Sequence, residues 1–172
     1  MLIEKSKSTL VIIDVQEKLV SVMPKPHTFI DNIIKLQKAA KALCIATYCS
    51  EQYPKGLGKT IKKIKENLDN KYYHLEKTEF SIPKNIGLQH LIICGIEAHV
   101  CVLQTAINLA KDKKVYVVQD AIASRNKKDY LTALGRLDKH PNIQIVSCEM
   151  VLFEWLRTSD HPEFKTISQL IK

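Results

Sequence analysis

The sequence alternates short β-branched runs with stretches whose apolar residues recur every three to four positions. Residues 9–15 (TLVIIDV) form a nearly continuous apolar run, as expected of a strand buried on both faces of a sheet. The stretch that follows carries its apolar residues on one helical face, namely Phe29, Ile30, Ile33, Leu36, Ala39, Ala40 and Leu43. This alternation is typical of a parallel sheet whose strands are joined by helices.

The same pattern continues along the whole chain. Strands are expected at residues 9–15, 44–49, 72–75, 90–94, 114–119 and 143–146. Helices are expected at residues 29–43, 59–68, 98–110, 127–139, 151–156 and 164–171, with a loop at 51–58. Right-handed crossovers place such helices on both faces of the sheet. The sequence therefore predicts an α/β fold: a three-layer α-β-α arrangement around a doubly wound, mainly parallel six-stranded sheet. With no internal repeat or linker, residues 1–172 are expected to form a single domain.

Apolar content and cysteine usage limit the class of protein. Apolar residues make up 45% of the chain, which suits a packed core and excludes a disordered chain. The longest apolar runs are far shorter than the roughly 20 residues of a membrane-spanning helix, and the N-terminus lacks the apolar stretch of a secretory signal. The cysteines are odd in number and include no CxxC pair, so they fit neither a disulfide framework nor a zinc site. A cytoplasmic protein with no membrane partner is expected.

The formal net charge of +8 raises the alternative of a nucleic-acid binder. The basic residues are spread over segments 62–71, 111–114 and 127–128, and acidic residues interrupt the first of these. The sequence carries neither an RNA-binding aromatic motif nor a Cys/His finger. These lysines are therefore expected on solvated helix faces, and no nucleic-acid partner is predicted. Binding to DNA or RNA that weakens steeply with salt would favour the alternative.

Three reactive side chains follow the ends of predicted strands. Asp14 ends the first strand, Lys77 follows the third, and Cys101 follows the fourth at the start of a helix. Ligands of such folds bind at these strand ends. A lysine ammonium and a helix N-terminus favour a thiolate, and a nearby carboxylate can act as general base. Taken singly, however, Asp14 could be a hydrogen-bonding cap, Lys77 a solvated surface lysine and Cys101 a buried structural thiol.

Several segments resemble the isochorismatase-like cysteine hydrolases, in order and with similar spacing. The most specific is residues 94–102 (CGIEAHVCV). It is accompanied by residues 14–16 (DVQ), 77–79 (KTE) and 120–125 (DAIASR). Residues 51–54 (EQYP) and 161–164 (HPEF) are similar to the isochorismatase-domain-containing branch of the family. The resemblance covers most of the chain.

This resemblance implies a role for each position of the site. Cys101 would be the nucleophile, Asp14 its general base, and Lys77 the cation that stabilises the thiolate. A non-proline cis peptide bond would lie between Ile96 and Glu97, and the backbone N–H groups of Glu97 and Cys101 would face an oxyanion. The implied reaction is attack on an acyl carbon, formation of a thioester, and hydrolysis by water.

The resemblance also implies which residues lie near the mouth of the substrate pocket. They are Gln16, Gln52, Tyr53, Phe80 and His99. Tyr53 and Phe80 could instead be simple packing residues. A direct pair between His99 and Cys101 is disfavoured, because near neighbours on a turn entering a helix more often point apart.

Two departures from the family pattern bear on metal and substrate. Nicotinamidases of this family bind a metal through an Asp and two His after the second strand, but residues 50–53 (SEQY) contain no histidine. None of the six histidines forms a metal-like pair, so no metal and no other cofactor are predicted. Isochorismatases proper lack the cysteine, so Cys101 argues against cleavage of a vinyl ether. No phosphate-cradling loop follows the first strand, which argues against nucleotide binding.

The sequence thus predicts a cysteine-dependent hydrolase of the C–N amidohydrolase type, acting on a small amide or related acyl compound. The alternative is a non-catalytic family member with a binding or assembly role. Many relatives associate, so a homo-oligomer, a dimer or larger, is expected, with the C-terminal helices as a candidate interface. Ligand binding without a covalent intermediate would favour the non-catalytic alternative.

Overall fold

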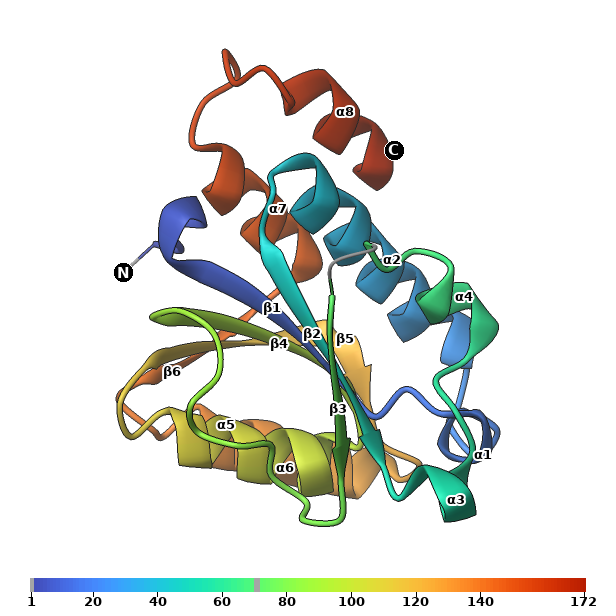
Figure 1. The fold of residues 1–172 in the computed structure, drawn as a ribbon. Coiled ribbons are helices and arrows are strands. Elements are labelled where there is room, and N and C mark those ends of the chain that lie inside the picture. Colours follow the sequence, from blue (N-terminus) through green and yellow to red (C-terminus); the bar gives the residue numbers. More distant parts are fainter. Residues whose placement is uncertain (1, 70–71) are drawn as a thin grey trace.

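The computed structural model describes residues 2–69 and 72–172. Its strands form one six-stranded sheet in the order β3-β2-β1-β4-β5-β6 (Figure 1). The strands are β1 (Ser8–Ile13), β2 (Ala46–Gln52), β3 (Tyr73–Lys77), β4 (His90–Ile96), β5 (Lys114–Ala123) and β6 (Ile143–Val146). Every pairing is parallel, and the strand order reverses between β1 and β4. The predicted doubly wound α/β fold is confirmed.

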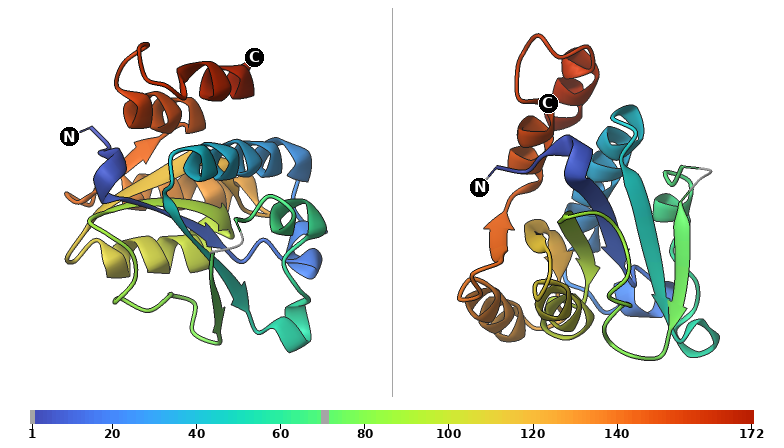
Figure 2. Two further views of the ribbon diagram at one scale, coloured as in Figure 1. Left: turned by 45° about the horizontal axis from the view of Figure 1, so that its top comes forward. Right: turned by 60° about the vertical axis from the view of Figure 1, so that its left-hand side comes forward.

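Helices cover both faces of the sheet (Figures 1 and 2). The longer helices are α2 (Pro26–Ala42), α5 (Leu103–Leu109), α6 (Lys127–Leu137) and α7 (Cys148–Leu156). The short elements are η1 (Lys5–Lys7), α1 (Glu17–Val20), α3 (Pro54–Leu57), α4 (Lys62–Lys65), η2 (Ala98–Val102), α8 (Phe164–Ser168) and η3 (Gln169–Ile171). Helices α2 and α7 pack on one face, and α5 and α6 pack on the other. Among the described residues, no helix has both the length and the apolar character needed to cross a membrane.

The alternation of side chains along β1 explains why the protein has two apolar cores. Leu10 and Ile12 belong to the core beneath α2 and α7, whereas Val11 and Ile13 belong to the core beneath α5 and α6. All residues of β1 are buried. A central parallel strand is covered on both faces, which is why its sequence is a continuous apolar run.

Four strands, β2, β3, β4 and β5, end later than their apolar patterns predict. β2 ends at Gln52, so Glu51 and Gln52 continue the strand instead of starting the expected loop at 51–58. They do so because Gln52 is still paired in register with Lys77 of β3. β5 extends to Ala123 and shifts its register against β4 on the way. Polar residues within a strand, such as Glu51 and Gln52 in β2 and Gln119 and Asp120 in β5, interrupt the apolar pattern, so the predicted strands ended at or before these residues.

Two expected helices are shorter or differently built. The helix expected at 59–68 is reduced to α4, because Ile61 is held in the loop by a hydrogen bond from its N–H to the Val15 carbonyl oxygen. Residues 70 and 71, at the end of the basic segment 62–71, lie outside the described residues. The helix expected at 98–110 begins as the wide π-helical turn η2 and continues as α5. In this wide turn the Glu97 carbonyl oxygen accepts the N–H of Val102 at 3.2 Å.

Gly95 marks the closest approach of β4 to β1. Its φ is +116°, and a Cβ atom added there would lie 2.1 Å from the carbonyl oxygen of Ile13. Because that obstacle is backbone in the central strand, no side-chain rotation can relieve it. Glycine is therefore required directly before the segment that carries the predicted nucleophile.

We expect the Gly95→Ala substitution to lower the free energy of unfolding by at least about 2 kcal/mol, through backbone strain and overlap with β1. Denaturant titration followed by circular dichroism measures this change. Gly135→Ala is the matched control, since a Cβ atom at Gly135 meets nothing within 4 Å on α6. That substitution should stabilise the protein by about 0.5–1 kcal/mol. Similar effects of the two substitutions would contradict this account of Gly95.

Candidate active site

The carboxyl ends of β1, β3 and β4 bring the three predicted reactive side chains together. Lys77 Nζ lies 2.7 Å from Asp14 Oδ2. The Cys101 thiol lies close enough to both groups for their charges to shift its pKa. Asp14 is fully buried, and Cys101 and Lys77 are 6% and 9% exposed. A thiol, a carboxylate and an ammonium thus share one buried site at the point where the strand order reverses.

Asp14 is oriented by its backbone and by a serine that the sequence did not single out. The residue directly follows β1 and has a φ of +50°, in the left-handed region that aspartate tolerates better than most residues. Its Oδ1 atom accepts a hydrogen bond of 2.6 Å from Ser50 Oγ on β2. Its Oδ2 atom accepts the hydrogen bond from Lys77. Both carboxylate oxygens are therefore fixed next to the thiol.

The Lys77 side chain is held in place by acceptors on several sides. Its Nζ donates to Asp14 Oδ2 at 2.7 Å and to Gln52 Oε1 at 2.6 Å. The carbonyl oxygens of Glu79 and Phe80 also accept from it, each at 3.3 Å. An ammonium has three protons and no acceptor, so this arrangement uses its full donor capacity. The charge of Lys77 is thereby kept within the site and away from solvent.

Gln16 and Gln52 hold the strand ends of the site together through hydrogen bonds. Both side chains are buried. Gln16 Nε2 donates to the carbonyl oxygens of Gln52 and Gly58, and Gln16 Oε1 accepts the N–H of Gln52 at 2.7 Å. Gln52 Nε2 donates to the Thr78 carbonyl oxygen at 2.6 Å, while its Oε1 accepts from Lys77. The two amides tie the end of β2 to the end of β3 and set the position of the Lys77 ammonium.

The Cys101 thiol keeps its proton at neutral pH. Burial raises the pKa of this thiol to about 12, and the negative charge of Asp14 acts in the same direction. Lys77 lowers the pKa, as the resemblance implied, but burial and the carboxylate outweigh it. Chemistry at this sulfur therefore requires a base, and Asp14 is the carboxylate whose charge acts on the thiol.

We call Asp14, Lys77 and Cys101 the candidate triad. A pocket of about 640 Å³ opens beside it, at Lys77. It is lined by Tyr53, Pro54, Lys55, Glu76, Lys77, Thr78, Glu79, Ser81 and Pro83. Lys77 is the member of the candidate triad on its wall, and Tyr53 also lines this pocket. Phe80 is half-exposed, and its carbonyl oxygen contacts Lys77. The pocket's volume suits a small molecule.

His99 is directed away from the thiol, toward the end of β5. Its Nδ1 lies 3.0 Å from Ser124 Oγ, and its Nε2 lies 4.0 Å from Asp129 Oδ2. Glu97 also binds the segment that follows β5, because its Oε2 accepts the N–H of Arg125 at 3.0 Å. Residues 120–125 thus brace the turn that carries Cys101. The peptide bond between Ile96 and Glu97 is cis, as the resemblance implied.

The comparison with known families agrees with this arrangement of strands and strand-end residues. A family model described as the isochorismatase domain matches residues 8–149. The chain belongs to the isochorismatase family. The match includes the strand-end segments of Asp14, Lys77 and Cys101, and it confirms the family that residues 94–102 and their companions predicted.

Members of the isochorismatase family that resemble this chain come from distant organisms. Isochorismatase domain-containing protein 2 of Danio rerio is 33% identical over 171 residues, which cover 95% of this chain and 86% of the relative. A secreted isochorismatase effector of Phytophthora sojae (strain P6497) is 34% identical over 178 residues, covering 96% of this chain and 84% of the relative. The solved structure of the MAR1 ribonuclease of Caenorhabditis elegans is 36% identical, has a TM-score of 0.93, and covers 99% of this chain and 92% of that chain.

Sequence reasoning missed the groups that position Asp14 and Lys77 in this member of the isochorismatase family. Ser50 gives no signal by itself, because a serine after a strand is common. Because side chains alternate between the faces of a strand, Ser50 and Gln52 lie on the same face of β2. Two polar residues at this spacing could have indicated a polar site on that face. The carbonyl oxygens that hold Lys77 come from residues 79 and 80 and carry no sequence signature at all.

Proposed function

We propose that this member of the isochorismatase family is a cysteine hydrolase that cleaves a small amide or related acyl compound through a thioester on Cys101. One observation carries the proposal: a buried thiol interacts with both a carboxylate and an ammonium beside a small-molecule pocket. In this proposal Cys101 is the nucleophile, Asp14 is the general base, and Lys77 is the cation that stabilises the thiolate. The proposed chemistry needs no cofactor, because the thiol is the nucleophile and the carboxylate moves the proton.

In the first half of the proposed reaction, Asp14 takes the thiol proton while the Cys101 sulfur bonds to the acyl carbon. The carbonyl electron pair moves to oxygen and gives an oxyanion. The backbone N–H groups of Glu97 and Cys101 are the proposed donors to this oxyanion, since N–H groups at the start of a helix have no partner within it. The C–N bond then breaks, and the leaving amine takes the proton from Asp14. A thioester remains.

In the second half, a water molecule attacks the thioester and Asp14 takes a proton from that water. The tetrahedral oxyanion collapses, the C–S bond breaks, and Cys101 sulfur leaves as a thiolate. Asp14 returns the proton to sulfur, and the carboxylic acid departs. Lys77 stabilises the thiolate in this step, because its ammonium is fixed beside both Asp14 and the sulfur.

Acyl transfer to hydroxylamine tests the proposal. A panel of small amides and the corresponding esters is incubated with the protein in the presence of hydroxylamine, and hydroxamates are measured by mass spectrometry. A thioester intermediate partitions between water and the added nucleophile, so every turned-over substrate should give hydroxamate in excess of a protein-free control, and this excess should require Cys101. Turnover that yields no hydroxamate and survives in Cys101→Ser would contradict the proposal. Saturable ligand binding with no acyl transfer would favour the non-catalytic alternative.

Cleavage of RNA is a second candidate, because the solved relative that is 36% identical is titled a ribonuclease and the net charge of this chain is +8. We favour the small acyl substrate, since Cys101 is 6% exposed and a polymer phosphodiester would have to enter a deep site to meet it. Incubation with end-labelled RNA separates the two candidates. Cleavage that Cys101→Ser abolishes, with binding that weakens steeply with salt, would favour the ribonuclease.

We also propose a cytoplasmic homo-oligomer, a dimer or larger. Met150 and Phe153 of α7 are 48% and 39% exposed, an unusual exposure for large apolar side chains on one short helix. The ring of Phe153 packs against that of Phe164 of α8, which extends the apolar surface over the C-terminal helices. Sedimentation velocity measures the assembly, and a monomer at micromolar concentration would contradict this part of the proposal.

A further inference from the structure

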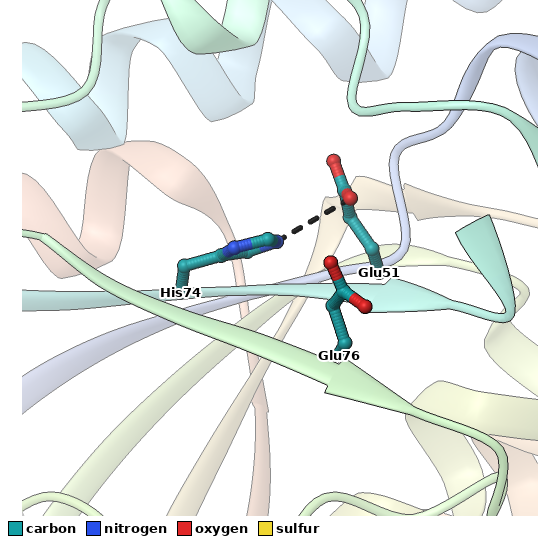
Figure 3. A group of neighbouring side chains, drawn as sticks. All are labelled: Glu51, His74 and Glu76. Atoms are coloured by element: carbon teal, nitrogen blue, oxygen red, sulfur yellow. Dashed lines mark ion pairs between the residues drawn. The ribbon is translucent and has the colours of Figure 1, made fainter. Parts of the chain in front are cut away.

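A second polar cluster lies on the face of the sheet opposite the triad. On β2, the side chain of Gln52 belongs to the triad's hydrogen-bond network, so its neighbour Glu51 points to the other face. On β3, Lys77 faces the triad, so Glu76 and His74 point to the other face in the same way. Figure 3 shows Glu51, His74 and Glu76 turned toward one another across the two strands.

The three side chains offer ligand atoms that already lie close together. Glu51 and Glu76 are directly paired in the register of β2 and β3. His74 Nε2 lies 3.3 Å from Glu51 Oε2, and one ligand atom from each of the three residues lies within 4.8 Å of the others. They line a cavity of about 160 Å³ together with Thr60 and Tyr72, which leaves room for an ion and its water.

Glu51 is held in place as an ionised ligand. Its side chain is buried, and its Oε1 accepts both the N–H of Thr60 at 2.7 Å and the Thr60 hydroxyl at 2.8 Å. Burial raises the pKa of the carboxyl, but the two bonds from Thr60 and the neighbouring His74 outweigh it and keep the pKa below its usual value. The Oε2 atom remains directed at His74 and Glu76.

The two carboxylates of the cluster, Glu51 and Glu76, are not balanced by an equal positive charge among the described residues. Like charges directly opposite one another on neighbouring strands destabilise the pair, and Glu51 and Glu76 are such a pair. Within residues 2–69 and 72–172, neither carboxylate forms an ion pair with a lysine, although Lys59 and Lys65 line the same cavity. The ion-pair partner present is His74, which supplies a full charge only when it is protonated.

We propose that Glu51, His74 and Glu76 bind one divalent transition-metal ion of the zinc class. One imidazole nitrogen and two carboxylate oxygens are a donor set that zinc accepts, with water as the fourth ligand. Metal–ligand bonds of about 2.0–2.2 Å bring tetrahedral donor atoms to about 3.5 Å from one another. The exposed side chains of His74 and Glu76 close this difference by rotating toward the fixed Glu51. The ion would tie the edge strand β3 to β2, and the imidazole ligand favours Zn²⁺ over Mg²⁺.

Calorimetric titration with Zn²⁺ tests the site directly. The full chain is stripped with a chelator, freed of it, and titrated at neutral pH with reductant present. The wild type should bind one Zn²⁺ per chain, and His74→Gln and Glu76→Gln should each weaken this binding at least tenfold. His27→Gln is the matched control, because His27 is exposed on α2 and lies outside the cluster; it should leave the affinity unchanged.

Thermal unfolding supplies a second readout that does not depend on the hydrolase proposal. Zn²⁺ should raise the Tm of the wild type and of His27→Gln, because a ligand that binds the native state stabilises it. It should raise the Tm of His74→Gln and Glu76→Gln less, and Mg²⁺ at the same concentration should have little effect. Absence of stoichiometric Zn²⁺ binding, or binding that survives in both cluster variants, would overturn the proposed site whatever the activity of Cys101.

Discussion

Replacing Cys101 with serine is expected to lower kcat/KM for any acyl substrate by at least about 10⁴-fold, the scale on which loss of a catalytic nucleophile acts in hydrolases. Serine keeps nearly the size of cysteine and a polar hydrogen at the same position, so the fold should survive. Its hydroxyl is a much weaker nucleophile and its alkoxide a much poorer leaving group, so neither half of the thioester pathway is maintained. Steady-state hydrolysis of a substrate found in the panel measures the effect.

Cys44→Ser is the matched control for this substitution. Cys44 is exposed, at the start of the segment that leads into β2, and it contributes nothing to the site. Its replacement should leave kcat/KM within about twofold of the wild type, since substitutions away from such features have little effect. If Cys101→Ser and Cys44→Ser retained equal activity, Cys101 would not be the nucleophile.

Asp14→Asn is expected to reduce kcat/KM by about 10²–10⁴-fold, the contribution of a positioned general base. It should also destabilise the protein by about 3–5 kcal/mol, because it leaves the Lys77 ammonium buried without its counter-charge. Lys77→Met should likewise destabilise the protein, since the buried Asp14 carboxylate would lose its counter-charge and the hydrogen bond from Lys77. Denaturant titration of each variant, with circular dichroism as the probe, gives these changes.

The double variant Asp14→Asn/Lys77→Met separates stability from catalysis. With both charges removed, it should be more stable than either single variant, because a buried ion pair can be replaced by neutral side chains at little cost. Its activity should remain as low as that of Asp14→Asn. Glu66→Gln provides a control, since it breaks the exposed pair between Lys62 and Glu66 and should change the stability by about 0.5 kcal/mol at most. Simple addition of the two single destabilisations would contradict the paired-charge account.

The parts of the fold that follow from burial could be predicted from the sequence. β1 and β4 are covered on both faces, so their residues form apolar runs, and the reactive residues after them fall at the same edge of the sheet. Asp14, Lys77 and Cys101 were therefore found as strand-end residues before any contact between them was visible. The sequence of segment 94–102 then indicated the family.

The parts that depend on how strands pair could not be predicted. Ser50 and Gln52 are polar residues in a strand, and only the register of β2 against β3 shows that they face Asp14 and Lys77. The pairing of Glu51 with His74 and Glu76 was missed for the same reason, because the ligands come from two strands and no local spacing joins them. The prediction that no metal binds was drawn from histidine spacing along the chain, and it stands against the proposal made for this cluster.

The state of the Cys101 thiol is a further case in which local reasoning was incomplete. A lysine and a helix N-terminus near the sulfur argue for a thiolate. Burial and the neighbouring Asp14 raise its pKa nonetheless, and these effects depend on the packing around the site. The same carboxylate that raises the pKa is the group that removes the proton in the proposed mechanism.

The most direct test of the central claim is to locate the acyl group on the protein during turnover. The protein is mixed with an activated ester of a small acid, quenched with acid, digested with trypsin and analysed by mass spectrometry. The tryptic peptide 85–111 contains both Cys94 and Cys101, so its fragment ions must be used to place the modification. The account predicts a thioester on Cys101 that is labile to hydroxylamine, absent in Cys101→Ser and diminished in Asp14→Asn. An acyl group on another residue, or turnover in the wild type with no acyl group on Cys101, would contradict it.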